Sequence, residues 1–257
     1  MPRLENRIAL ITGGGAGIGA ACARLFCSEG AAVTLVDADG AALERTVHTI
    51  RSELPHARLT HFTANVADAA LAAAAVQHCV DEYGGLDLLV NNAAMRNYSA
   101  VANATPDEWQ AMVNVNLIGA ANYCRAALPL LRRSGHGSIV NVSSCYAVTG
   151  RKGMGIYDAT KAGQLALTRT LAHEEAEHGV RVNAVCPGST LTDFHIARAS
   201  TSGKSVEKLK GERQDTSLMK RWAAPEEIAW PILWLASGEA SFMTGTTVMV
   251  DGGLHIM

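Results

Sequence analysis

Short apolar segments alternate with longer helical segments along most of the chain, and this alternation constrains the fold more than any other feature. Segments rich in β-branched residues predict strands at residues 8–12, 32–37, 58–63, 86–91, 138–143, 180–186 and 247–251. Helical patterns lie between them, at residues 17–29, 41–54, 69–83, 107–132 and 155–177. Many strands are apolar on both faces, which is typical of a parallel sheet covered on both sides. We therefore expect a doubly wound α/β fold with a parallel sheet of about seven strands.

Composition narrows the class of protein and of partner. With 257 residues, 48% of them hydrophobic, the chain can bury a large core, and no repeat or low-complexity linker divides it. We expect one domain over residues 1–257. The net charge of −2 offers no electrostatic footprint for nucleic acid or an anionic membrane. No uninterrupted apolar run reaches the roughly 18 residues of a membrane span. The expected partner is a small molecule.

The cysteines and histidines indicate neither disulfides nor a metal site. The six cysteines include no CxxC pair, and the nine histidines include no HxxxH spacing. The thiols are therefore expected to be small core residues in a reducing compartment. The first seven residues lack the basic region and apolar run of a secretory signal. A cytoplasmic protein without a metal ion is expected.

The first predicted strand leads directly into the glycine-rich sequence TGGGAGIG. Glycines permit a tight turn and a close approach of backbone N–H groups to a pyrophosphate, and a helix N-terminus favours its negative charge. The spacing fits GxxxGxG through Gly13, Gly17 and Gly19, or GxGxxA through Gly15, Gly17 and Ala20. A flexible turn is the alternative. The position between a strand and a helix favours a Rossmann-like dinucleotide site.

Asp37 indicates which dinucleotide is bound. It stands 18 residues after Gly19, at the end of the second predicted strand, close to the spacing expected for a carboxylate that binds the adenosine ribose. A carboxylate there would accept hydrogen bonds from both hydroxyls and repel a 2′-phosphate. Neither residues 14–16 nor Ala38 supply a basic side chain. NAD(H) is therefore predicted over NADP(H), the alternative for Asp37 being a turn residue in DADG.

Tyr157 and Lys161, in the sequence YDATK, predict an acid/base pair. Four residues apart, the phenol and the ammonium lie on one face of a helix. The ammonium and the positive ring of an oxidised nicotinamide favour an ionised phenol, which can exchange a proton with a substrate. Ser144, thirteen residues upstream at a strand end, can hydrogen-bond the oxygen of an alcohol or carbonyl. The alternative for Ser144 is a turn residue.

These motifs resemble the short-chain dehydrogenase/reductase family over residues 4–253. They follow the family's order along the chain, as TGGGAGIG, NNAA, NVNLIG, SS, YDATK, RVNAVCPG and TGTTVMVDGG. The resemblance implies that Tyr157 is the general acid/base, that Lys161 binds the nicotinamide ribose, and that Ser144 positions the reacting oxygen. It also implies that Asn116 holds a water that relays a proton from Lys161.

The resemblance extends the expected cofactor site. It implies that Asn92 stabilises the central strands near the cofactor and that Thr192 contacts the carboxamide. The other cofactor-binding residues that it implies are Ile18, Val66, Ala93, Pro187, Gly188 and Thr190. Two positions depart from the family: Asn65 replaces the usual Asp beside the adenine, and Ala94 replaces the glycine of NNAG. The amide oxygen of Asn65 can still accept from the adenine amine.

We therefore predict an NAD(H)-dependent oxidoreductase that interconverts a secondary alcohol and a ketone, with a sugar, a polyol or a hydroxy acid as substrate. Two alternatives stay open. The first is reduction of a 3-oxoacyl thioester, which usually goes with NADPH and is disfavoured by Asp37. The second is a dinucleotide-responsive binding protein that uses the same fold without turnover. The presence of Ser144, Tyr157, Lys161 and Asn116 argues against the second.

A polar segment over residues 189–224 interrupts the alternation and predicts a mobile lid near the ligand. Its residues 189–221 carry seven basic and four acidic side chains. Together with Arg96, after NNAA, and Arg151, between Ser144 and Tyr157, they predict a site for an anionic substrate. Arg96 and Arg151 are the best candidates because they lie nearest to the motifs. The alternative is that the lid and its cations are solvated surface features.

The segment at residues 226–236 predicts an oligomer. It is apolar nearly all round, which a surface helix of a monomer cannot be without exposing a large patch. The family resemblance implies a homotetramer built from this helix, the last strand and the long helices that carry Asn116 and Tyr157.

Overall fold

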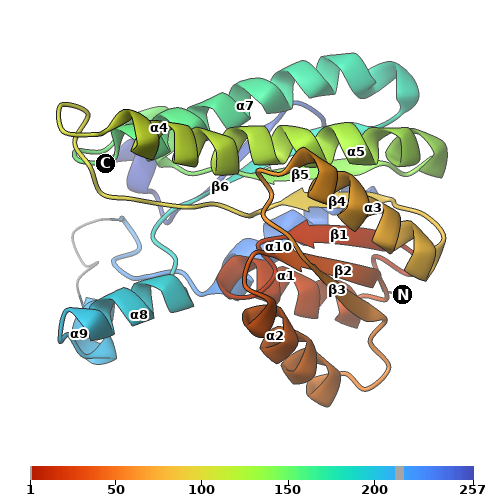
Figure 1. Ribbon diagram of the computed structural model, residues 1–257, viewed down its shortest axis with the longest axis horizontal. Helices are drawn as coiled ribbons and strands as arrows, with labels where there is room; N and C mark the ends of the chain where they lie inside the picture. Colours follow the sequence, from red (N-terminus) through yellow and green to blue (C-terminus); the bar gives the residue numbers. More distant parts are fainter. Residues whose placement is uncertain (1, 212–216) are drawn as a thin grey trace.

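One parallel sheet forms the centre of the molecule (Figure 1). The computed structural model describes residues 2–211 and 217–257, and within these ranges the sheet has seven strands in the order β3-β2-β1-β4-β5-β6-β7. The strands are β1 (Ile8–Thr12), β2 (Ala32–Asp37), β3 (Leu59–Thr63), β4 (Leu88–Asn91), β5 (Ser138–Val142), β6 (Arg181–Pro187) and β7 (Thr247–Val250). This confirms the predicted sheet, with every predicted strand found within two residues at each end. The strand order reverses between β1 and β4, where such sheets bind their ligands.

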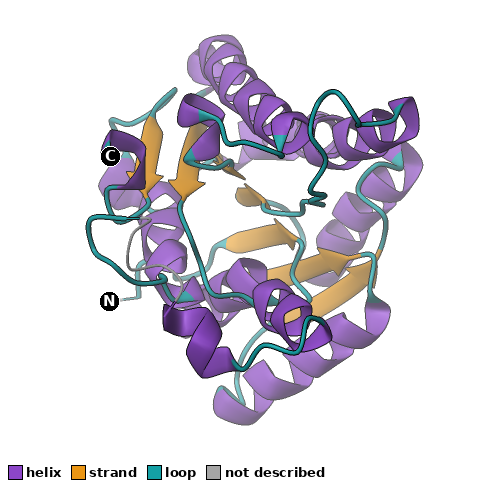
Figure 2. Ribbon diagram, turned by 90° about the vertical axis from the view of Figure 1, so that its left-hand side faces the viewer, coloured by secondary structure: helices purple, strands orange, loops and turns teal. Residues whose placement is uncertain are grey.

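Helices cover both faces of the sheet, so the strands are apolar on both sides (Figure 2). One face packs against α1 (Gly17–Ser28), α2 (Gly40–Glu53) and α10 (Pro225–Ala236). The other packs against α3 (Ala69–Tyr83), α5 (Gly119–Ser134) and α7 (Gly155–Glu175). Alternate residues of β1 show the division, because Ile11 belongs to the first core and Leu10 to the second. None of the helices within the described ranges is long and apolar enough to cross a membrane.

The predicted helix over residues 107–132 is interrupted in its middle. The structure has α4 (Pro106–Val113), a π-helical segment (Asn114–Ile118) and then α5. At the start of α4, the hydroxyl of Thr105 accepts from the backbone N–H of Glu108, whose carboxylate accepts from the N–H of Thr105. In the π segment, the N–H of Gly119 bonds to the carbonyl of Asn114, five residues earlier. The prediction of one regular helix is therefore wrong at Asn116, which this turn carries.

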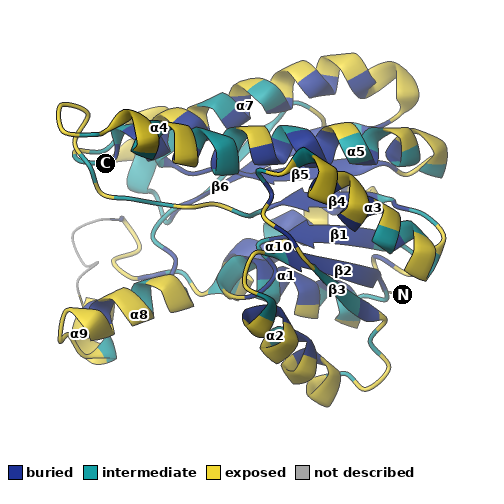
Figure 3. Ribbon diagram, in the orientation of Figure 1, coloured by how far each residue is buried: buried dark blue, intermediate teal, exposed yellow. Residues whose placement is uncertain are grey.

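The predicted lid contains two short helices, α8 (Asp193–Thr201) and α9 (Val206–Gly211), which lie beside the main body of the molecule (Figure 1). Their outer surfaces are largely exposed (Figure 3). Trp222 joins them, because its ring packs with Ala199 and Leu209 and its indole N–H donates to the carbonyl of Leu209 at 2.8 Å. Arg213 of the predicted basic set, with Glu212 and Asp215, lies outside the described residues.

Candidate active site

A cavity of about 450 Å³ opens at the carboxyl ends of the central strands. Its lining brings together segments that follow β1, β2, β4, β5 and β6, the start of α7 and the first turn of α8. The predicted site residues that line it are Gly13, Gly17, Ile18, Asp37, Asn92, Ala93, Arg96, Ser144, Arg151, Tyr157, Lys161, Pro187, Gly188, Thr190 and Thr192. Five predicted residues do not line it: Gly15, Gly19, Asn65, Val66 and Asn116.

Gly13 and Gly19 of the glycine-rich loop lie too close to their neighbours to carry side chains. A Cβ atom on Gly19 would lie 2.0 Å from the carbonyl oxygen of Gly13, and one on Gly13 would lie 2.8 Å from the Cα of Ala93. The amide of Asn92 donates to the carbonyls of Thr12 and Gly13, at 3.0 Å each. This loop forms an open backbone cradle at the N-terminus of α1, which fits a pyrophosphate.

The carboxylate of Asp37 is fixed at the end of β2. One oxygen accepts from the N–H of Gly15 at 3.0 Å, and the other accepts from the N–H of Asp39 at 3.1 Å. A carboxylate offers about four acceptor sites, so two remain for the hydroxyls of a ribose. Asn65 is exposed, and its side-chain oxygen accepts from the N–H of Ala67 in a local turn.

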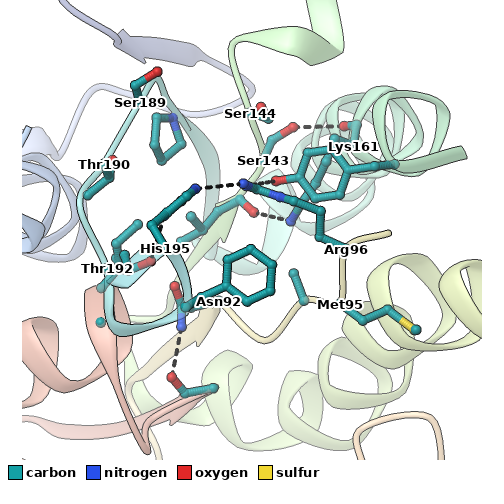
Figure 4. Close-up of a pocket in the computed structure, with 18 of the residues that line it drawn as sticks. Asn92, Met95, Arg96, Ser143, Ser144, Lys161, Ser189, Thr190, Thr192 and His195 are labelled. Atoms are coloured by element: carbon teal, nitrogen blue, oxygen red, sulfur yellow. Dashed lines mark hydrogen bonds between the residues drawn. The ribbon is translucent and has the colours of Figure 1, made fainter. Parts of the chain in front are cut away.

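Ser144, Tyr157 and Lys161 are buried at the inner end of the cavity, and Figure 4 shows Ser144 and Lys161 there. The hydroxyl oxygen of Ser144 accepts from the N–H of Tyr146 at 3.2 Å. The Nζ of Lys161 donates to the carbonyl of Val142 at 2.7 Å and lies 5.8 Å from the centre of the Tyr157 ring.

The charge on Lys161 is weakened by its surroundings. Burial and, to a smaller extent, the positive charge of Arg96 lower the pKa of Lys161 to about 7, against an opposite effect of Cys186. Lys161 is therefore only partly protonated near neutral pH in the cofactor-free protein.

Asn116 is buried behind the cavity, and its polar atoms are engaged by the protein. Its amide donates to the carbonyl of Met95 at 3.0 Å and to the hydroxyl of Thr160 at 3.1 Å. Its side-chain oxygen accepts from the N–H of Met95 at 2.8 Å. Its main-chain carbonyl accepts from the side chain of Gln164 at 2.6 Å. Asn116 thus holds the loop after β4, and the water that the resemblance implies stays a prediction.

Arg96 lies beside Tyr157, at the end of the cavity where a substrate is expected (Figure 4). Its guanidinium donates to the hydroxyl of Tyr157 at 3.3 Å and contacts the Nε2 of His195 at 3.1 Å. Arginine only donates, so Nε2 accepts, and the Nδ1–H of His195 donates to the hydroxyl of Thr192 at 3.0 Å. His195 was not anticipated, because a lone histidine in a polar segment shows no pattern.

Two further charged contacts surround the cavity. At its cofactor end, the carboxylate of Asp193 accepts from the N–H of Gly17 at 3.1 Å. At its substrate end, the guanidinium of Arg151 stacks 3.8 Å from the centre of the Tyr146 ring, while its Nε and Nη2 are buried without a described hydrogen-bond partner. Burial raises the pKa of the neighbouring Asp158, and the positive charges of Arg151 and Arg96 oppose this rise.

The chain belongs to the short-chain dehydrogenase/reductase family. A family profile described as enoyl-(acyl carrier protein) reductase matches residues 13–255. The chain is 37% identical to 3-oxoacyl-[acyl-carrier-protein] reductase FabG of Thermotoga maritima, over 99% of this chain and all of that protein. It is 35% identical to 2-(S)-hydroxypropyl-CoM dehydrogenase 3 of Xanthobacter autotrophicus, over 98% of each chain. The crystal structure of levodione reductase matches with a TM-score of 0.92 and 30% identity, over 99% of each chain.

These relationships confirm the family that the motifs predicted. The protein is an oxidoreductase that acts on CH–OH or C=O groups with a nicotinamide dinucleotide. Hydrogen-bond donors and acceptors that fit such a cofactor lie along the cavity: the glycine cradle, the carboxylate of Asp37, and the buried Tyr157 and Lys161.

Proposed function

We propose that this protein catalyses the reversible oxidation of a secondary alcohol to a ketone with NAD(H), and that the substrate carries a carboxylate beside the reacting carbon. The observation that carries the proposal is one cavity that joins Asp37 and the glycine loop at one end to Ser144, Tyr157 and Arg96 at the other. When bound, NAD⁺ accepts a hydride from the alcohol carbon, and NADH returns it to the ketone.

The choice of NAD(H) rests on Asp37. Its carboxylate is held by two backbone N–H groups. Residues 14–16 and Ala38 supply no basic side chain that could neutralise a 2′-phosphate. The ribose hydroxyls of NAD(H) can donate to its remaining acceptor sites, whereas a phosphate would meet a like charge.

The catalytic residues divide the work of proton transfer. Tyr157 takes the hydroxyl proton of the alcohol and returns it to the ketone in the reverse direction. Ser144, whose oxygen already accepts from the N–H of Tyr146, donates its own proton to the substrate oxygen and so orients it. Lys161, as the ammonium, binds the nicotinamide ribose and favours the ionised phenol electrostatically.

The position of Arg96 supports the proposal that the substrate carries a carboxylate. Its guanidinium lies within hydrogen-bond distance of the Tyr157 hydroxyl, and no described carboxylate forms an ion pair with it. A guanidinium binds a carboxylate through two parallel hydrogen bonds. Because Arg96 touches the reacting phenol itself, the carboxylate would sit on the carbon next to the carbinol, as in a 2-hydroxy acid. Arg151 would provide a second cation at the same end of the cavity.

The test is an NAD⁺-linked absorbance screen of 2-hydroxy acids against their neutral amides. We expect the acid to be preferred, and Arg96→Met to raise its KM about 10-fold to 100-fold with little effect on the amide, since a charged hydrogen bond contributes about 1.5–3 kcal/mol. Arg45→Met, an exposed change on α2, is the matched control. Equal turnover of acid and amide would contradict the proposal that the substrate carries a carboxylate. A neutral polyol or sugar would then be favoured as the substrate.

A 3-oxoacyl thioester is the second candidate, because one relative with 37% identity is named a 3-oxoacyl-[acyl-carrier-protein] reductase. The same screen, run with an acetoacetyl thioester and either NADH or NADPH, decides between the two. Faster reduction of the thioester with NADPH would favour this candidate and would overturn the role proposed for Asp37.

We also propose a homotetramer in the cytoplasm. All six cysteines are free thiols, which supports a reducing compartment. The exposed rings of Trp230 and Phe242 support an interface between subunits.

A further inference from the structure

The side chain of Gln164 joins the catalytic lysine to the π-helical segment. Gln164 lies on α7, three residues after Lys161, and is 1% exposed. Its side-chain oxygen accepts from the Nζ of Lys161 at 3.1 Å, and its side-chain nitrogen donates to the main-chain carbonyl of Asn116 at 2.6 Å. The orientation of the amide is determined by its partners, because an ammonium only donates and a carbonyl only accepts.

This contact reduces the number of N–H donors that the ammonium of Lys161 can offer to a ligand. An ammonium has three N–H donors. The carbonyl of Val142 accepts from one of them and the amide oxygen of Gln164 from another, so one N–H is left, on a group that lines the cavity. The remaining donor is the one available to the ribose of a bound cofactor.

The side chains whose charges act on Lys161 do not pair with its ammonium. Among the described residues, this leaves Gln164 as its side-chain hydrogen-bond acceptor. Arg96, from the loop after β4, opposes the positive charge, and Cys186, from β6, favours it weakly. The Tyr157 ring lies 5.8 Å away on α7. Among the described residues no carboxylate pairs with Nζ, and Gln164 is its side-chain hydrogen-bond acceptor.

We propose that Gln164 is a positioning residue that favours the protonated form of Lys161 and directs its remaining N–H toward the cofactor. The proposal rests on the proposed function, in which Lys161 acts as the ammonium. An amide oxygen accepts a hydrogen bond but is far too weak a base to take the proton. Gln164 therefore orients the side chain of Lys161 without itself accepting the transferred proton.

The test measures NADH affinity as a function of pH, with the native protein, Gln164→Met and Gln164→Glu. NADH is an anion, so its dissociation constant rises as Lys161 loses its proton. Met has nearly the shape of Gln but no amide oxygen to accept from Lys161. In Gln164→Met, the midpoint of this rise should therefore lie about one pH unit lower, the size expected for one charged hydrogen bond. In Gln164→Glu, the negative carboxylate should move the same midpoint about one pH unit higher. Gln77→Leu, an exposed amide on α3, leaves it unchanged.

The same three proteins give a second reading in the pH profile of kcat/KM, whose falling limb shifts in the same directions. An affinity that drops equally at every pH, with an unmoved midpoint in both Gln164 variants, would show a merely structural role and overturn the proposal. If Gln164→Met fails to fold, the Glu variant alone decides by the direction of its shift. Shifted binding midpoints in a protein that oxidises no alcohol would uphold Gln164 and contradict the proposed function.

Discussion

Among the single residues, we propose that Asp37 determines which cofactor is used. Its carboxylate is fixed by the N–H groups of Gly15 and Asp39, so it cannot turn away from a 2′-phosphate without losing both bonds. We expect native kcat/KM to favour NAD⁺ over NADP⁺ by more than about tenfold, a difference above roughly 1.4 kcal/mol. Asp37→Ala should narrow this ratio. Initial rates with both cofactors measure it, and equal use by the native enzyme would contradict the assignment.

Lys161 makes the stability of the cofactor-free protein depend on pH. Burial lowers the pKa of Lys161 from 10.5 to about 7, so between these values the unfolded chain binds more protons than the folded chain. Stability therefore rises with pH across this window, as the cost of burying the charge disappears. We expect this rise to be smaller in Lys161→Met and unchanged in Lys208→Met, an exposed control. Urea unfolding at fixed protein concentration measures it, and parallel curves for all three proteins would contradict it.

Among the helices, α8 begins in contact with the glycine-rich loop. The carboxylate of Asp193 accepts from the N–H of Gly17, where the pyrophosphate of a cofactor would bring negative charge. Cofactor binding must displace or repel this group. Asp193→Asn should therefore lower the dissociation constant of NADH about twofold to fivefold, with a larger effect at low salt. Calorimetric titration tests this, with Glu207→Gln on α9 as the control, and weaker binding by the Asn variant would refute it.

The elements also show where sequence reasoning succeeds. The seven strands could be predicted because each is a short apolar run between helical segments, and sheet burial enforces that pattern. The π-helical segment could not be predicted, because one residue of slippage leaves the apolar spacing of a long helix almost unchanged. The same limit applies to side-chain partners. Gln164 resembles any polar residue on a helix, and the contact between Arg96 and Tyr157 joins positions 61 residues apart.

At the scale of the whole molecule, one edge of the sheet is left incompletely covered. The last strand, β7, has intermediate exposure along its whole length. Helix α10 buries Ile228 and Ile232 but exposes 48% of Trp230, and Phe242 beyond it is fully exposed. Large exposed aromatic residues on neighbouring elements are typical of an interface.

The family resemblance implies four subunits, so we expect a mass in solution of about four times the 27.1 kDa of one chain. Trp230→Glu and Phe242→Glu should shift the protein toward smaller species, because each would place a charge in a buried contact. Light scattering at micromolar concentration measures the mass. A native protein that stays monomeric there would show that this surface has another role.

We propose that the fold places Tyr157 to exchange a proton with an alcohol while NAD(H) exchanges the hydride. The most direct test compares NADH formation by the native enzyme and Tyr157→Phe with the best alcohol of the screen. We expect kcat to fall about 10²-fold to 10⁴-fold in the Phe variant, with NADH affinity nearly unchanged, because the phenol acts mainly in the transition state. A Phe variant that kept a tenth or more of the native rate would contradict it.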